Sequence, residues 1–189
     1  TTLSLQRLLS FFLTRTQMNK MTKPRTHPFF LWLGLLLLSL SLTSCGNHET
    51  TYALTDGTKF QFSELKGRVV FINYWAEWCK PCRTEMPELN TFQKEWHDRV
   101  QVLAVNYDGV TGDQLSTQAK AMGINFPVLT TDPRQQFGVT ASGALPETLV
   151  IDTQGVYQKV LLGPQTVESL LAVVHELETH ELATDRGDK

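Results

Sequence analysis

The chain has 189 residues, which is enough for one domain with its own hydrophobic core and a targeting segment. The formal net charge is −2, but residues 1–44 hold five Lys/Arg and no Asp/Glu, which leaves 12 Lys/Arg against 19 Asp/Glu in the remainder. This acidic remainder carries no basic patch, so its composition argues against a nucleic-acid partner.

The N-terminal region is predicted to be a targeting signal and not part of the folded domain. An apolar run at 29–42 follows Lys20, Lys23 and Arg25. About 14 residues fall short of the roughly 20 that span a bilayer, whereas a basic segment followed by a short apolar one is typical of a secretory signal.

Two methionines are candidate starts of this signal. The sequence begins with Thr1, and a start at Met18 or Met21 would give a signal of normal length. We therefore expect residues 1–17 to be an upstream extension, whose role the sequence leaves open.

The signal ends at a cysteine. Leu42-Thr-Ser-Cys45 resembles the bacterial lipobox, in which the cysteine is lipidated and becomes the new N-terminus. We predict a lipoprotein signal at 1–44, lipidation of Cys45 and a polar tether at 45–50, with Gly46 favouring the outer membrane over the inner one. The alternative is a plain signal anchor in which Cys45 is incidental.

The elements of the mature chain follow from periodicity and turn residues. The segment 52–62 is predicted as a β-hairpin around Asp56-Gly57, and 68–75 is near-continuously apolar, as expected of a strand buried on both faces. Apolar residues at helical spacing predict a helix at 81–96. The remaining predicted elements are a helical turn at 63–67, a strand at 100–105, a helix at 113–122, a strand at 126–129, a helical turn at 133–137, strands at 148–151 and 156–162, and a helix at 166–182.

This order of elements predicts an α/β fold. Strands that alternate with helices indicate a largely parallel central sheet, and the hairpin formed by 148–151 and 156–162 adds an antiparallel edge. We therefore expect a mixed sheet flanked by helices, with an N-terminal β-hairpin extension, over 51–182. Residues 183–189 are predicted to be a polar tail.

Two cysteines lie where the buried strand meets the long helix, in Trp78-Cys79-Lys80-Pro81-Cys82. A helix N-terminus and nearby positive charge lower the pKa of a cysteine thiol, so we expect Cys79 to be exposed and reactive. A zinc site needs four ligands, and no second cysteine pair is present. Haem attachment would need His at position 83, which is Arg83.

Two sequence segments resemble the thioredoxin superfamily. Residues 74–87 (Tyr-Trp-Ala-Glu-Trp-Cys-Lys-Pro-Cys-Arg-Thr-Glu-Met-Pro) resemble its active-site strip, most closely that of the membrane-tethered TlpA/ResA type of thiol–disulfide oxidoreductase. Residues 138–152 resemble the segment that contains the family's cis-proline, here Pro146. Both segments imply a thioredoxin-like fold. Peroxidases of similar fold have Thr where this chain has Ala76.

The resemblance implies roles for nine residues. Cys79 attacks and Cys82 resolves the mixed disulfide, while Glu85 replaces the buried aspartate of thioredoxin, whose place Asn73 takes. Alternatively, Glu85 is only an acid that complements the helix dipole. The predicted substrate-binding residues are Trp78, Lys80, Pro81, Leu145, Pro146 and Glu147. Glu147 could equally be a coincidental loop acid.

The resemblance also implies a function. It predicts a monomer that faces the periplasm, needs no cofactor or metal beyond the Cys79–Cys82 pair, and reduces disulfides of envelope proteins. A membrane electron donor would supply the electrons, and cytochrome c maturation would be one use. Two alternatives stay open, namely an oxidant of DsbA type and a non-catalytic lipoprotein whose binding surface is gated by the redox state of the pair.

Overall fold

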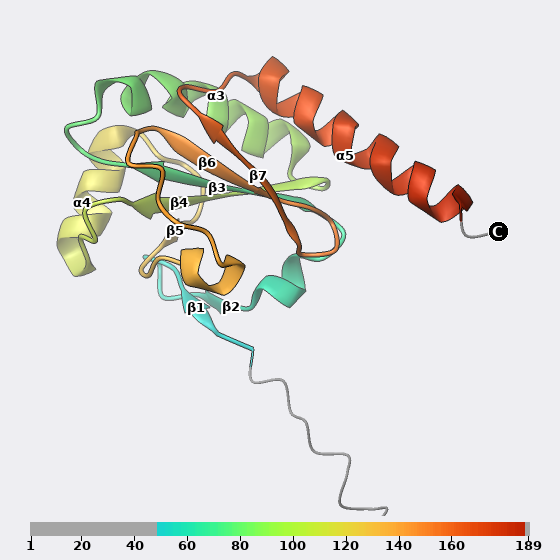
Figure 1. Ribbon diagram of the computed structural model, residues 1–189. Coiled ribbons are helices and arrows are strands. Elements are labelled where there is room, and N and C mark those ends of the chain that lie inside the picture. The colour runs from blue at the N-terminus through green and yellow to red at the C-terminus, as the bar shows by residue number, and fades with distance from the viewer. Residues whose placement is uncertain (1–48, 188–189) are drawn as a thin grey trace, which may run out of the picture. The chain divides into compact units, whose positions relative to one another are not determined.

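A computed structural model describes residues 49–187 of the chain, with side chains to residue 183 (Figure 1). The predicted signal peptide, Cys45 and residues 45–48 of the tether lie outside the described residues. No helix within 49–187 combines the length and the apolar character that a membrane crossing requires.

A twisted five-stranded sheet lies at the centre, in the order β5–β4–β3–β6–β7. Both β4 and β5 run parallel to β3, whereas β6 is antiparallel to β3 and β7 to β6. This arrangement confirms the predicted mixed sheet. The strands are β3 (Val69–Trp75), β4 (Val100–Asn106), β5 (Val128–Leu129), β6 (Glu147–Ile151) and β7 (Tyr157–Leu162).

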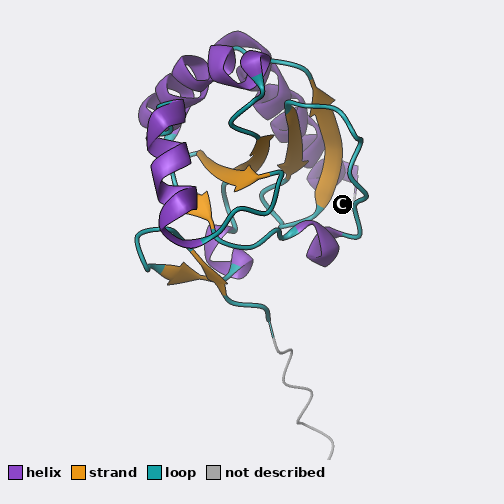
Figure 2. Ribbon diagram, turned by 90° about the vertical axis from the view of Figure 1, so that its left-hand side faces the viewer, coloured by secondary structure: helices purple, strands orange, loops and turns teal. Residues whose placement is uncertain are grey.

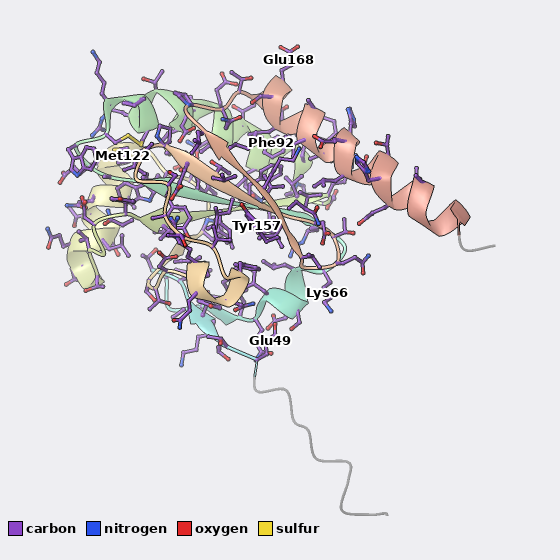
Figure 3. The ribbon with its side chains drawn as sticks, viewed as in Figure 1. Glu49, Lys66, Phe92, Met122, Tyr157 and Glu168 are labelled. Carbon is purple, nitrogen blue, oxygen red and sulfur yellow. A yellow bond between two sulfur atoms is a disulfide. The ribbon has the colours of Figure 1, made fainter. Side chains whose placement is uncertain are left out.

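The three long helices cover one face of this sheet (Figure 2). Right-handed crossovers from β3 to β4 and from β4 to β5 place the connecting helices on the same side. Phe92, labelled in Figure 3, packs edge-on against Phe71 of β3 with ring centroids 5.3 Å apart. The helices are α3 (Lys80–Trp96), α4 (Gly112–Met122) and α5 (Val167–Gly187).

The opposite face is covered by shorter elements. These are the hairpin β1 (Tyr52–Ala53) and β2 (Lys59–Phe60) and the 3-10 turns η2 (Phe62–Leu65) and η3 (Arg134–Phe137). Aromatic rings from these elements pack edge-on against one another, which joins the hairpin to the domain. The predicted N-terminal hairpin is therefore confirmed as a layer over the second face.

Two of the element ends that differ from expectation have a clear physical reason. Phe62 begins η2 and does not extend the hairpin, because its ring turns inward onto Phe137. The last helix continues to Gly187, five residues beyond the expected end at Leu182. Residues 183–186 contain neither glycine nor proline, so nothing in them stops a helix. The predicted polar tail is thus helical over most of its length.

Candidate active site

Cys79 and Cys82 form a disulfide at the N-terminus of α3. Cys79 is the N-cap residue, and its Sγ accepts a hydrogen bond of 3.2 Å from the backbone N–H of Cys82. Pro81 lies in the first turn, where a missing N–H costs the helix nothing. The sulfur of Cys79 therefore accepts a backbone N–H at the positive end of the helix dipole, and both favour a thiolate after reduction.

The expected exposure of Cys79 is wrong for this oxidised form. Cys79 is only 3% exposed and Cys82 is fully buried, because both pack into the apolar cluster that includes Trp75 and Met86. The half-buried Leu145 also packs against this cluster. A partner protein therefore meets a covered disulfide and not a protruding sulfur.

Glu85 is buried one turn beyond Cys82. Its Oε1 accepts a hydrogen bond of 2.8 Å from Nδ2 of Asn73, and its Oε2 accepts one of 3.0 Å from the backbone N–H of Gln165. Asn73 in turn donates to Oγ1 of Thr148 at 3.0 Å. Asn73, which takes the place of the thioredoxin aspartate, thus holds Glu85, the candidate proton acceptor, in place.

Burial raises the pKa of Glu85 to about 7, although the hydrogen bonds from Gln165 and Asn73 oppose the shift. A carboxylate of this pKa is half-ionised near neutral pH and can exchange a proton there. The first turn of α3 contains no acidic residue and Glu85 is 1% exposed, which argues against the alternative of an acid that only complements the helix dipole. The catalytic role remains a prediction.

The predicted substrate-binding residues divide into two groups. Lys80 and Pro81 are exposed, and Trp78 is 66% exposed while its indole N–H donates to Asp108 at 2.9 Å. These side chains form an accessible rim around the covered disulfide. Such a rim suits contact with another protein, but their role in binding stays a prediction.

The second group consists of Leu145 and Pro146, at the end of the loop before β6, and Glu147, the first residue of that strand. The Leu145–Pro146 peptide bond is cis, which confirms that expectation. Glu147 follows directly and lies opposite Tyr74 in the β3–β6 register. Because side chains alternate along a strand, Glu147 points to the face with η2 and η3, whereas Thr148 points to the face with Glu85. Glu147 is therefore not part of the Glu85 network.

Sequence reasoning missed the partners of both buried glutamates. Thr148 and Gln165 complete the Glu85 site, and Arg134 binds Glu147 with Nη2 2.5 Å from Oε1. The only signal for Arg134 was a charged residue inside the predicted helical turn at 133–137. Among residues 49–187, no group of three His, Cys, Asp or Glu side chains could hold a metal ion.

Comparisons with known proteins agree with this geometry. The sequence profile of the AhpC/TSA family matches residues 47–160. The chain is 32% identical over 128 residues to the thiol-disulfide oxidoreductase ResA of Bacillus thuringiensis, which covers 66% of this chain and 73% of that protein.

Solved structures give the same result. A thioredoxin-family thiol:disulfide interchange protein from Chlorobium tepidum matches with a TM-score of 0.55 and 29% identity, over 68% of this chain and 92% of that one. The exposed lipoprotein thioredoxin Etrx1 of Streptococcus pneumoniae matches with a TM-score of 0.55 and 27% identity, over 68% and 99%. With its cysteine pair at a helix start, the chain therefore belongs to the AhpC/TSA family of thioredoxin-like proteins, close to the ResA type of thiol–disulfide oxidoreductase.

Proposed function

We propose that this thiol–disulfide oxidoreductase reduces disulfides of partner proteins in the bacterial envelope. The observation that carries the proposal is the Cys79–Cys82 pair at the N-terminus of α3 with a buried carboxylate one turn further on. The helix start favours the attacking thiolate on Cys79, and Glu85 offers a base to the resolving thiol of Cys82.

The reaction transfers two electrons from the cysteine pair to the substrate disulfide. The thiolate of Cys79 attacks one substrate sulfur, the substrate S–S bond breaks, the other substrate sulfur leaves as a thiolate, and a mixed disulfide with Cys79 forms. Cys82 then loses its proton to Glu85 and attacks Sγ of Cys79, the mixed disulfide breaks, and the substrate sulfur that Cys79 held leaves as a thiolate. The two substrate thiolates take up protons from Glu85 and from water. The substrate is reduced, and the pair ends as the disulfide seen in the structure.

The envelope location is supported by the signal-like N-terminus and by the relatives. The pneumococcal protein is described as an exposed lipoprotein, and the lipobox-like segment before Cys45 fits the same arrangement. Disulfides persist in oxidising compartments, so a reductase there needs its own electron donor. We propose a membrane donor and, as one class of substrate, the cysteines of apocytochromes.

Turnover and reduction potential test this function. The protein without its signal should reduce insulin disulfides at the expense of dithiothreitol, and Cys79→Ser should abolish the activity. A potential near thioredoxin's, about −270 mV, supports reduction, whereas one near about −120 mV indicates an oxidant of DsbA type. Absence of insulin turnover would favour the redox-gated binder.

The order of attack has its own test. Cys82→Ser lacks the resolving thiol, so it should accumulate mixed disulfides with substrate proteins, whereas Cys79→Ser should not. Non-reducing gels of envelope extracts would separate the two variants. Equal trapping by both would contradict the assignment of Cys79 as the attacking sulfur.

A further inference from the structure

A buried ion pair lies directly beside the predicted substrate loop. Glu147 is 1% exposed and Arg134 is 8% exposed. Nη2 of Arg134 lies 2.5 Å from Oε1 of Glu147, and the other carboxylate oxygen accepts a hydrogen bond of 3.1 Å from the backbone N–H of Ser142. Both oxygens of Glu147 are thus hydrogen-bonded within the protein, and the buried side chain is not accessible for direct contact with a substrate.

Arg134 is itself fixed from several directions. Its guanidinium carbon lies 3.9 Å from the centroid of the Tyr74 ring, and its Nε lies 3.6 Å from Oδ2 of Asp132. The hydroxyl of Tyr74 donates to Oδ1 of Asp132 at 2.6 Å, and the same oxygen accepts the backbone N–H of Arg134 at 2.8 Å. Since Tyr74 lies opposite Glu147 in the sheet, the network links β3, η3 and β6.

The loop between η3 and β6 depends on this network. Residues 140–144 are exposed, and within the described part of the chain one hydrogen bond attaches them to other segments, namely that from Ser142 to Glu147. The two further hydrogen bonds of this stretch join Ser142 and Ala144 to each other. The loop continues into Leu145 and Pro146, which the resemblance to the thioredoxin superfamily predicts to bind the substrate.

We propose that Arg134 and Glu147 are positioning residues that hold the 138–146 loop, so that the backbone at Leu145–Pro146 is presented to a protein substrate beside Cys79. This inference rests on the proposed function. It gives Glu147 the indirect role of holding the loop, in place of the direct contact with substrate that the sequence predicted. A charged hydrogen bond holds a loop more strongly than a neutral one. A loop that is already ordered loses less conformational entropy when the substrate binds.

The role predicts a separation between two kinds of substrate. A protein disulfide must pair its backbone with the loop, whereas a small disulfide needs only the sulfur of Cys79. Loosening the loop should therefore weaken binding of the protein substrate and leave the chemistry of the cysteine pair unchanged. The reduction potential should also stay the same, because the network lies on the sheet face opposite Glu85.

Glu147→Gln tests this separation, since it keeps the side-chain shape and removes the charge. With dithiothreitol as reductant, we expect KM for insulin to rise about tenfold, as for a lost charged hydrogen bond, while kcat for hydroxyethyl disulfide stays within about twofold. Arg134→Lys, which keeps the charge but loses the fork and the stacking on Tyr74, should show the same split in weaker form. Glu176→Gln, which breaks the more exposed ion pair of Glu176 with Lys159, is the matched control and should match the unsubstituted protein on both substrates.

Two results would overturn the inference. One is an unchanged KM for insulin in both loop variants. The other is an equal fall of activity toward insulin and hydroxyethyl disulfide, which would place Glu147 in the thiol chemistry. Circular dichroism checks that each variant is folded. If Glu147→Gln does not fold, the measurements on Arg134→Lys decide the test. Failure of the unsubstituted protein to reduce insulin would instead refute the proposed function.

Discussion

Glu85 is the residue on which the proposed proton transfer depends. Its carboxylate is buried and held by Asn73 and Gln165, with a pKa of about 7. Below this pH it is protonated and cannot accept a proton from Cys82, so the rate of resolution should rise as the pH passes through about 7. The pH dependence is therefore the signature of its role.

Glu85→Gln should remove this rise and slow resolution about 10²-fold at pH 8, within the usual range for a lost general base. Single-turnover reduction of a mixed disulfide on Cys79, followed from pH 5 to 9, measures it. Glu88→Gln is a matched control, because Glu88 also accepts a backbone N–H at the start of α5, that of Val167 at 3.0 Å, without a bond to Asn73. A wild-type rate across this range in Glu85→Gln would make Glu85 a structural acid.

The same residue should affect stability. Its pKa of about 7 in the fold exceeds the ordinary 4.5, so between these values the folded state binds more protons than the unfolded state. The free energy of unfolding therefore falls as pH rises through this window, by roughly 3 kcal/mol from this group alone. Urea titrations of the oxidised protein should show this fall, and Glu85→Gln should lack it. If the free energy of unfolding changed with pH in the same way in both proteins, the result would contradict a buried and uncharged Glu85 carboxyl.

At the scale of elements, the contact of β3 with α3 positions the cysteine pair. Phe92 of α3 is fully buried against Phe71, so Phe92→Ala should lower the free energy of unfolding by about 3–5 kcal/mol. Chemical denaturation measures the loss. The exposed Val156 serves as control, since Val156→Ala should change stability by less than about 0.5 kcal/mol. A small effect of Phe92→Ala would mean that α3 is held chiefly by its other contacts.

The elements themselves could be predicted because their signals are local. The apolar run 69–75 and the helical spacing of Met86, Leu89 and Phe92 placed β3 and α3 to within a residue or two. The Arg134–Glu147 network could not be predicted, since it joins Tyr74 to residues about 60 and 73 positions away and depends on strand register. The covered state of Cys79 likewise depends on packing from distant segments such as Leu145.

At the scale of the whole molecule, the folded domain begins close to the predicted lipid anchor. The backbone carbonyl of Glu49 accepts a hydrogen bond from Gln61, and its carboxylate accepts one from the backbone N–H of Ser63. Glu49 is thus already fixed to the domain, four positions after Cys45. Four residue steps span at most about 14 Å, so a lipid on Cys45 would hold the domain near the membrane surface.

Cys45→Ala tests this arrangement. Because Cys79 and Cys82 are paired with each other, the substitution leaves the active site intact and removes only the lipid attachment point. We expect the variant to appear in the soluble envelope fraction or to keep its signal uncleaved, whereas the unsubstituted protein stays with the membranes. Fractionation with immunoblotting, together with insulin turnover of the released protein as a check on folding, gives the answer. A variant that remains in the membrane and is still cleaved before residue 45 would show that Cys45 carries no lipid and that the domain is held there by another contact.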